Sequence, residues 1–360
     1  MSDGTQGNCF VAMPPNTAAD TVIIGRNSEN EKLVGVAQEV AYYEPNESLE
    51  GKKHLLVSDC TPLRVVLQKP IPGIWGGDCG SNERSVSIAI TWANEIKGDV
   101  SVYDVIRLAL GSSETADDAF DCILELVTRY GDDDAKFSLI VGDPTKVWII
   151  SCAGKNWAGQ QIMKGVHHLP NDGLAVTKNF DKSNEDLGET LRKKARWDGE
   201  GEIDFAAAFD CSPTASTEWV DDKPPDDGSF KLTNMFETLR SAAKEETSRS
   251  ATVFVLSKNG ISSHWFTATP NTSESVFKPF VFAPKPKISP LTKAPPEGGE
   301  ITLLHKLHGQ RKVTALEHLK ALEAACVEEV SAYLAEHPTV NEELDELMKD
   351  CVEAEVKFYR

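Results

Sequence analysis

The chain has 360 residues, of which 37 are Lys or Arg and 56 are Asp or Glu, so its formal net charge is -19. A hydrophobic share of 40 % in a chain of this length is enough for a large buried core, and the length predicts one or two domains. A surface this acidic repels phosphate backbones and anionic lipids, which argues against nucleic-acid and membrane-surface partners. No apolar run is long enough for a membrane span, and residues 1–8 lack the basic and apolar regions of a signal peptide. We therefore expect no membrane insertion and a cytoplasmic location.

The first hundred residues are rich in short apolar runs. Residues 9–13 and 21–25 each predict a strand. Over 86–91, apolar side chains alternate with small polar ones, which is typical of a strand with one buried face.

The hydrophobic period changes to a helical one over residues 101–131. Two helices are predicted there. Thr115 and Asp118 form a capping box at the start of the second helix, and Gly131 stands at its end.

Strands and helices continue to alternate beyond this point. We predict a hairpin, a surface loop, a helix and a second hairpin, at 137–150, 212–229, 231–245 and 252–268. The prolines of 284–300 are compatible with neither a helix nor a strand, so this segment is predicted to be a stiff linker. Apolar residues at helical spacing then predict helices near 316–333 and 341–358.

The sequence contains none of the common catalytic or metal-binding motifs. Its eight cysteines include no C-x-x-C pair, and its eight histidines lack metal-ligand spacing. The adjacent His167 and His168 would face opposite sides of a strand. There is no glycine-rich phosphate loop, no H-E-x-x-H and no G-x-S-x-G. We predict neither a metal nor a cofactor.

Cys9 opens the first predicted strand and follows eight residues that are mostly small or polar. If those residues were removed, Cys9 would have a free α-amine, whose ordinary pKa is about 8, beside a thiol, whose ordinary pKa is about 8.5. One residue would then supply both base and nucleophile at neutral pH. A cysteine near an N-terminus is more often structural than catalytic, so this residue alone leaves both interpretations open.

Several blocks of sequence together resemble the secernins, which belong to the dipeptidase branch of the N-terminal-nucleophile (Ntn) hydrolases. The blocks follow the family's order along the chain and are CFVAMPP at 9–15, GRNS at 25–28, QEVAY at 38–42, WGGDCGSNE at 75–83, GEGE at 199–202, FTATP at 266–270, SVFKPF at 275–280 and DCVEAEVKF at 350–358. The resemblance implies an α+β fold, namely the four-layer αββα Ntn-hydrolase sandwich, with a C-terminal helical extension. The expected segments are a propeptide at 1–8, the hydrolase domain at 9–283, the Pro-rich linker at 284–300 and a helical segment at 301–360 packed on the domain.

The resemblance also implies roles for individual residues. Cys9 is the implied nucleophile, released when its thiol attacks the Asn8 carbonyl, and Gly7 would permit the strained turn that this attack needs. Arg26 matches a basic position whose charge favours the thiolate. Asn82 matches the asparagine whose amide and backbone N–H line the oxyanion hole.

Two more residues are implied to bind substrate. Glu29 falls where related enzymes place an acid that receives an α-ammonium group, and Asn179 lies near a second asparagine of the superfamily. Arg249 is a further candidate. Asp78 and Glu83 flank one loop and, as solvated loop acids, are assigned no chemical role.

Two functions remain open at this stage. The first is a cytoplasmic cysteine hydrolase of dipeptidase or amidase type that acts on a small peptide or amide. The second is a catalytically silent regulator of exocytosis that keeps the scaffold and binds protein partners in secretion.

Overall fold

The computed structural model of the chain describes residues 5–29, 38–56, 59–71, 73–94, 100–214, 223–244, 246–295, 298–312 and 315–359. The strands in these ranges are β1 (Thr5–Ala12), β2 (Thr21–Glu29), β3 (Gln38–Tyr43), β4 (Val65–Pro70), β5 (Cys79–Asn82), β6 (Ser87–Ala93), β7 (Lys136–Gly142), β8 (Val147–Ala153), β9 (Asn156–Ile162), β10 (Val166–Leu169), β11 (Lys182–Ser183), β12 (Ser248–Ser257), β13 (Ser263–Phe266) and β14 (Lys278–Phe280). The helices are α1 (Pro45–Ser48), α2 (Val102–Ser112), α3 (Ala116–Tyr130), α4 (Leu187–Lys193), α5 (Phe205–Ala208), α6 (Leu232–Ala242), α7 (Leu303–Gln310), α8 (Ala315–Glu336) and α9 (Leu347–Lys357).

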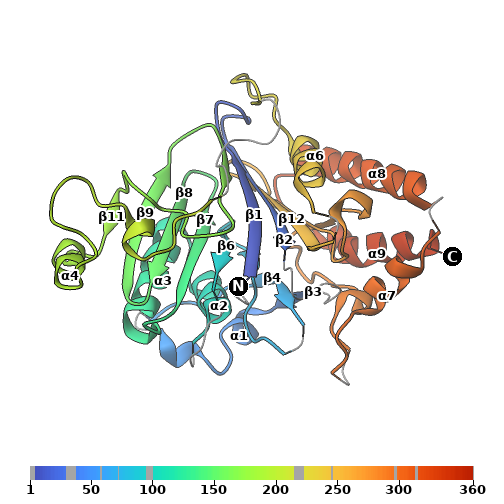
Figure 1. Cartoon of the computed structure of the whole chain (residues 1–360). Helices are drawn as coiled ribbons and strands as arrows, with labels where there is room; N and C mark the ends of the chain where they lie inside the picture. The colour runs from blue at the N-terminus through green and yellow to red at the C-terminus, as the bar shows by residue number, and fades with distance from the viewer. Residues whose placement is uncertain are drawn as a thin grey trace.

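All described strands belong to one antiparallel hydrogen-bonded sheet. Its main path runs β11-β9-β8-β7-β6-β1-β2-β12-β13-β14, and β3, β4 and β5 extend from β6. Strand β1 lies near the middle of this path (Figure 1). One edge of β1 pairs with β2, whereas the other pairs first with β6 and then with β10.

One apolar core lies between the inner faces of two parts of the sheet, of which one contains β2 and the other contains β7. A Cβ atom added to Gly142 of β7 would lie 2.6 Å from a methyl group of Ile24 on β2, so β7 and β2 approach closely at this point. Helices α2 and α3 cover the outer face of β4–β8, where Phe120 packs on Trp148. Helix α6 covers β2 and β12, with Met235 against Gly25. The α+β class is thus confirmed, while assignment to the Ntn αββα sandwich stays a prediction.

Most predicted elements are present with shifted ends. The capping box of Thr115 and Asp118 is formed, but Gly131 has an extended backbone, not a left-handed one. Strand β6 is buried on both faces, so the expectation of one solvated face is wrong. Ile88 and Ile90 pack beneath α2 on one side, and Ala89 and Trp92 face the inner core on the other. Of the predicted loop at 212–229, residues 215–222 lie outside the described residues.

The Pro-rich segment is packed against the domain and is not a free linker. Its described residues form no helix or strand beyond the 3₁₀ turn Pro290–Thr292, as the prolines predict. Ser289 and Thr292 are fully buried, and the Ala294 N–H donates to Glu39 Oε2 at 2.8 Å.

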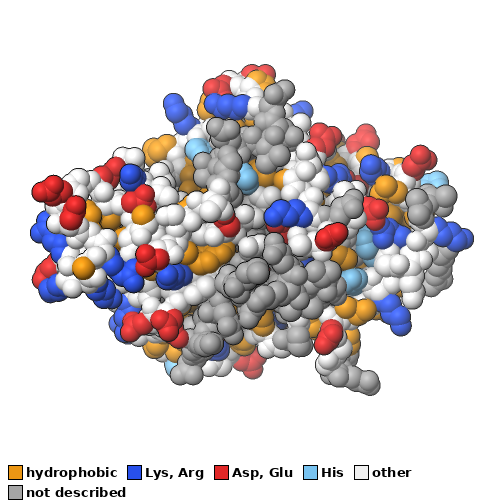
Figure 2. Space-filling view, in the orientation of Figure 1, with side chains coloured by type: hydrophobic (Ala, Val, Ile, Leu, Met, Phe, Trp, Pro, Cys, Tyr) orange, Lys and Arg blue, Asp and Glu red, His pale blue; other side chains and the backbone are white. Residues whose placement is uncertain are grey.

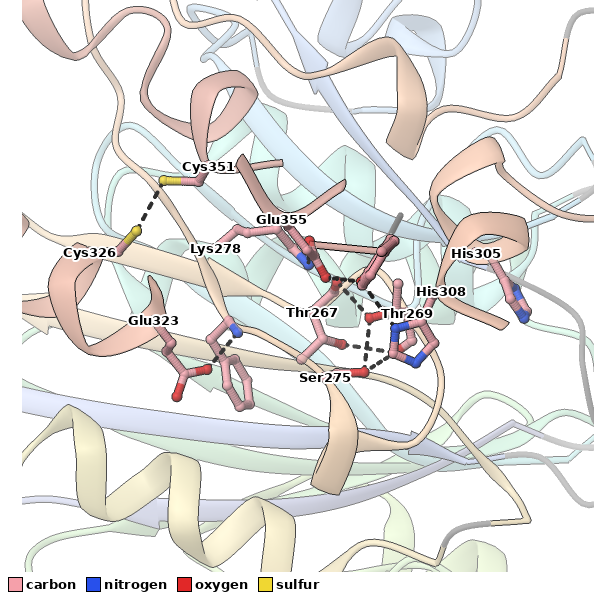
Figure 3. Close-up of polar contacts among 12 residues, drawn as sticks. Thr267, Thr269, Ser275, Lys278, His305, His308, Glu323, Cys326, Cys351 and Glu355 are labelled. Atoms are coloured by element: carbon pink, nitrogen blue, oxygen red, sulfur yellow. Dashed lines mark hydrogen bonds and ion pairs between the residues drawn. The ribbon is translucent and has the colours of Figure 1, made fainter. Parts of the chain in front are cut away.

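Buried ion pairs join the C-terminal helices to the rest of the fold, and the pair of Lys278 and Glu355 is drawn in Figure 3. Lys278 Nζ of β14 lies 2.7 Å from Glu355 Oε2 of α9, and both side chains are 0 % exposed. Glu323 of α8 pairs with Arg240 of α6 at 2.7 Å and accepts the Phe277 N–H at 2.7 Å. Charges buried in this way are stable only when paired, so these contacts fix the position of α8 and α9.

All eight cysteines are free thiols, including Cys326 of α8 and Cys351 of α9, whose sulfur atoms lie 3.3 Å apart (Figure 3). Acidic and basic side chains are interspersed on the face drawn in Figure 2. Within the described residues, no helix has both the length and the apolarity to cross a bilayer.

His264 of β13 makes stability sensitive to acid. Its ring is fully buried among Phe254, Phe280 and Phe282, and neither ring nitrogen has a hydrogen-bond partner among the residues that the structure describes. Burial lowers the pKa of His264 from 6.5 to about 3. The unfolded chain therefore binds a proton between these pH values while the folded chain does not, so the stabilising effect of the neutral ring is present above pH 6.5 and is lost as pH falls toward 3.

We expect His264→Phe to flatten the fall in stability between pH 6 and pH 4. For each pH unit of acidification, the free energy of unfolding of the wild type should fall by about 1 kcal/mol more than that of the variant. Urea unfolding at several pH values measures this difference. Equal slopes for the two proteins would contradict the assignment.

Candidate active site

Cys9 lies in the interior of strand β1, directly opposite Arg26 of β2. Its side chain is 0 % exposed and faces the core between the two parts of the sheet. Residues 5–8 belong to the same strand, whereas the sequence predicts a strand that begins at Cys9. The difference arises because Gln6, Gly7 and Asn8 find ladder partners on β2, and Gln6 finds a second partner on β6.

The Arg26 guanidinium forms the charged centre of the site. Nη1 donates to Asp78 Oδ2 at 3.1 Å, and Nε donates to the Ile90 carbonyl at 2.9 Å. The Cys9 sulfur lies 3.7 Å from the same carbonyl. Arg26 Nη2 also reaches the Gln6 carbonyl at 3.5 Å. One cation therefore contacts Asp78, the β6 backbone and the segment that precedes Cys9.

A buried hydrogen-bond network supports this ion pair. Ser28 and Gln38 both donate to Asp78 Oδ2, and Gln68 donates to Gln38 Oε1 at 2.7 Å. The network continues to β12 through Ser250, which donates to Gln38, and Thr252, which donates to Gln68. Its members are at most 1 % exposed and are Arg26, Ser28, Gln38, Gln68, Asp78, Ser250 and Thr252. Because Ser28 and Gln38 hold the Asp78 carboxylate and Asp78 holds Arg26, the guanidinium has a fixed position.

Asp78 is the residue that sequence reasoning missed. The sequence predicts a solvated loop acid without a role, yet Asp78 is fully buried and pairs with Arg26. The only sign of this role in the sequence is that Asp78 directly precedes the Cys79–Asn82 strand. A charged side chain at a strand end can point into the core if an oppositely charged side chain lies there. Glu83 behaves as predicted and pairs with Arg64 at 2.8 Å in a partly exposed position.

Burial raises the pKa of the Cys9 thiol to about 12, although the Arg26 charge acts to lower it. Asp78 and Glu29 add to the increase. The thiol is thus protonated at neutral pH in this structure. Loss of the burial would leave Arg26 as the cation beside the sulfur.

Gly7 is required by the close approach of neighbouring chains. A Cβ atom there would lie 2.1 Å from the Ile90 carbonyl oxygen and 2.4 Å from Arg26 Nε. The sequence suggests a strained turn as the reason for this glycine, but residue 7 lies in a regular strand and needs the space for Arg26.

We expect Gly7→Ala to lower the free energy of unfolding by about 1–3 kcal/mol through overpacking. The measurement is urea unfolding in a Cys9→Ala background, with intact mass used to select chains that carry residues 1–8. Gly309→Ala is the matched control, because no atom of the described part of the chain lies within 4 Å of its added Cβ. Similar stability changes in the two variants would show that position 7 is not crowded.

Glu29 and Arg249, two other residues predicted from the sequence, are buried near the charged centre at Arg26. Glu29 is 1 % exposed, contacts Asn171 Nδ2 at 3.4 Å and Lys244 Nζ at 4.0 Å, and its charge acts on Cys9. Arg249 is 2 % exposed, and burial lowers its pKa while the Asp78 charge acts to raise it. Both lie at the end of β1 occupied by residues 5–8.

Asn82 is not brought to Cys9 by this geometry. Its Nδ2 donates to the Leu110 and Ser113 carbonyls at 2.7 and 2.8 Å, and its Oδ1 accepts the Arg84 and Val86 N–H groups. Its backbone N–H donates to the Val86 carbonyl at 2.9 Å. The amide thus closes a turn and satisfies carbonyls at the end of α2, so the expected oxyanion-hole role has no donor available in this structure.

Asn179 is also placed away from the network. It lies in an exposed loop with a left-handed backbone, φ 56°, and its N–H donates to Glu202 Oε1 at 2.9 Å. Asn171 is the asparagine that the structure brings to Glu29. The substrate-binding prediction for Asn179 is therefore not supported by its position.

His168 and Asn8 form a second contact on the opposite face of β1. His168 Nε2 lies 2.6 Å from Asn8 Oδ1, and its ring stacks on Phe10 with centroids 4.6 Å apart. Asn8 Nδ2 donates to the Ala242 carbonyl at 3.4 Å.

Among the described residues, no group of three or more His, Cys, Asp or Glu side chains is arranged to hold a metal ion. A scan of the sequence against models of protein families finds no match.

Proposed function

We propose that the protein is a secernin-like Ntn cysteine hydrolase that releases residues 1–8 and then hydrolyses a small peptide or amide with Cys9. In this proposal the thiol attacks the substrate carbonyl, and the departing amine takes the proton through the Cys9 α-amine. Water then cleaves the thioester and restores the thiol. The αββα Ntn sandwich and the propeptide at 1–8 are part of the same proposal.

The observation that supports it most is the pairing of Cys9 with Arg26 across β1 and β2. A structural cysteine needs no cation, whereas an arginine held beside the sulfur favours the thiolate once the site is opened. Asp78 is assigned as a positioning residue because it acts through Arg26.

The donor to the developing oxyanion is assigned to Arg26, not to Asn82. The Arg26 guanidinium lies beside the Cys9 sulfur, and its Nη2 donates to the Gln6 carbonyl, two residues before the Asn8 carbonyl that would react. Charged donors of this kind are well suited to stabilise negative charge in a site closed to water. Glu29 is kept as the acid that receives a substrate ammonium group.

The pH dependence of alkylation tests this proposal. In the released protein we expect iodoacetamide to modify Cys9 with a midpoint near pH 8.5 or below, as for an accessible thiol beside a cation. Cys152 is the control, because it is fully buried and burial raises its pKa too. No modification of Cys9 up to pH 10 would contradict the proposal.

That contrary result would favour the second candidate, a non-enzymatic regulator that binds protein partners in secretion. The specific observation in its favour is the raised pKa of the covered thiol, about 12. A chain that never loses residues 1–8 would keep Cys9 protonated and inert.

A further inference from the structure

The segment before Cys9 occupies a defined place in the sheet, between β2 and β6. Gln6, Gly7 and Asn8 pair with Glu29, Ser28 and Asn27 of β2. Thr5 and Gln6 pair with β6, and the Thr5 hydroxyl bonds the Tyr103 hydroxyl. Removal of residues 5–8 would leave the backbone groups of two strand edges free to pair with another extended chain.

The release step and the proposed turnover form the same kind of intermediate. In release, the Cys9 sulfur bonds to the Asn8 carbonyl carbon, the Asn8–Cys9 C–N bond breaks, and the thiol proton passes to the new α-amine. Water then adds, the C–S bond breaks, the thiol regains a proton and the segment leaves as a carboxylic acid. A substrate acyl group on the same sulfur must be hydrolysed in the same place.

The Asn8 side chain is held by groups that belong to the rest of the fold. Its Oδ1 can only accept, so the 2.6 Å contact requires His168 Nε2 to donate. Its Nδ2 donates to the Ala242 carbonyl. Stacking on Phe10 fixes the plane of the His168 ring. The His168 donor and the Ala242 acceptor together complement a carboxamide. A carboxylate would instead place one of its oxygen atoms, which is an acceptor, against the Ala242 carbonyl oxygen, which is also an acceptor.

The position before Asn8 adds a second restriction. Gly7 leaves no room for a Cβ atom, because the Ile90 carbonyl and Arg26 fill that space. A substrate can therefore have glycine there, or no residue at all when its α-amine is free.

We propose that residues 5–8 mark the acyl-side subsites, and that the substrate is an asparaginyl or glycyl-asparaginyl amide whose carboxamide is read by His168. This inference rests on the proposed hydrolase function. His168 acts as a specificity-determining residue and has no part in bond breaking.

The experiment measures kcat and KM of the released protein on four coumarin amides: acetyl-Gly-Asn, acetyl-Gly-Leu, acetyl-Gly-Asp and acetyl-Ala-Asn. We expect kcat/KM for acetyl-Gly-Asn to exceed each of the others by about tenfold or more. His168→Leu should remove the preference for Asn over Leu, mainly through KM, and His168→Gln should restore part of it. His167→Leu is the matched control from the adjacent position of β10, and its preference should equal that of the wild type.

Binding gives a second readout that does not depend on the rate or on a variant. The acid acetyl-Thr-Gln-Gly-Asn should bind the released protein, and replacement of its Asn by Leu should weaken the affinity by about tenfold. Hydrolysis of the four amides without preference, together with equal affinity of the two acids, would overturn the inference and leave the hydrolase function standing. A chain that keeps residues 1–8 and hydrolyses none of the amides would overturn both.

Discussion

Replacing Cys9 by alanine is expected to lower amide hydrolysis by about 10³-fold or more, because the variant lacks the only proposed nucleophile. Initial rates on acetyl-Gly-Asn-coumarin, or on whichever amide the wild type hydrolyses fastest, measure the effect. Cys9→Ser should keep a small residual rate, since a hydroxyl is a weaker nucleophile than a thiol at neutral pH.

Cys152→Ala is the control for this comparison. Cys152 is also a fully buried strand cysteine, but it lies in the outer core beneath α2 and α3. Its loss should cost some stability and leave the rate per folded molecule unchanged. Full activity in Cys9→Ala, or an equal loss in both variants, would argue against Cys9 as the nucleophile.

Replacing Asp78 by asparagine is expected to lower the free energy of unfolding by about 3–5 kcal/mol. The variant leaves the Arg26 guanidinium buried without its carboxylate, and both side chains are 0 % exposed. Urea unfolding at pH 7 measures the change. The double variant Arg26→Met with Asp78→Leu should regain much of the loss, because it removes both charges from the core.

An exposed ion pair provides the reference for this measurement. Arg84 and Glu114 lie 3.8 Å apart and are more than half exposed, so Glu114→Gln should change stability by no more than about 0.5 kcal/mol. If Asp78→Asn were as mild as Glu114→Gln, the buried ion pair would not be the centre of the network.

The order of elements could be predicted from local patterns. The strands at 21–25 and 137–150, the helix opened by Thr115 and the terminal helices follow from hydrophobic period and capping, which are properties of neighbouring residues. Seven of the described strands were not predicted, namely β3, β4, β5, β9, β10, β11 and β14. Of these, β10 is too polar and β11 too short to show a hydrophobic pattern.

The candidate site was predictable in part. Cys9 and Arg26 could be named from the sequence, but the Asp78 partner of Arg26 depends on two strands meeting across the core, which no local pattern reveals. Asn82 illustrates the opposite case. Its motif suggested an oxyanion donor, while the structure uses its amide at the end of α2, a contact that depends on where that helix packs.

The extension of β1 upstream of Cys9 could not be predicted either. Of residues 5–8 only Thr5 has a high β propensity, and their strand conformation comes from ladder partners on β2 and β6. This tertiary effect makes residues 5–8 part of the central sheet.

The most direct test of the account is the intact mass of the purified wild-type protein, compared with that of Cys9→Ala. We predict that the wild-type chain lacks residues 1–8 and begins with a free amine at Cys9, while the variant keeps them. A folded wild-type chain that retains residues 1–8 would contradict the account, because its Cys9 thiol would stay covered and protonated.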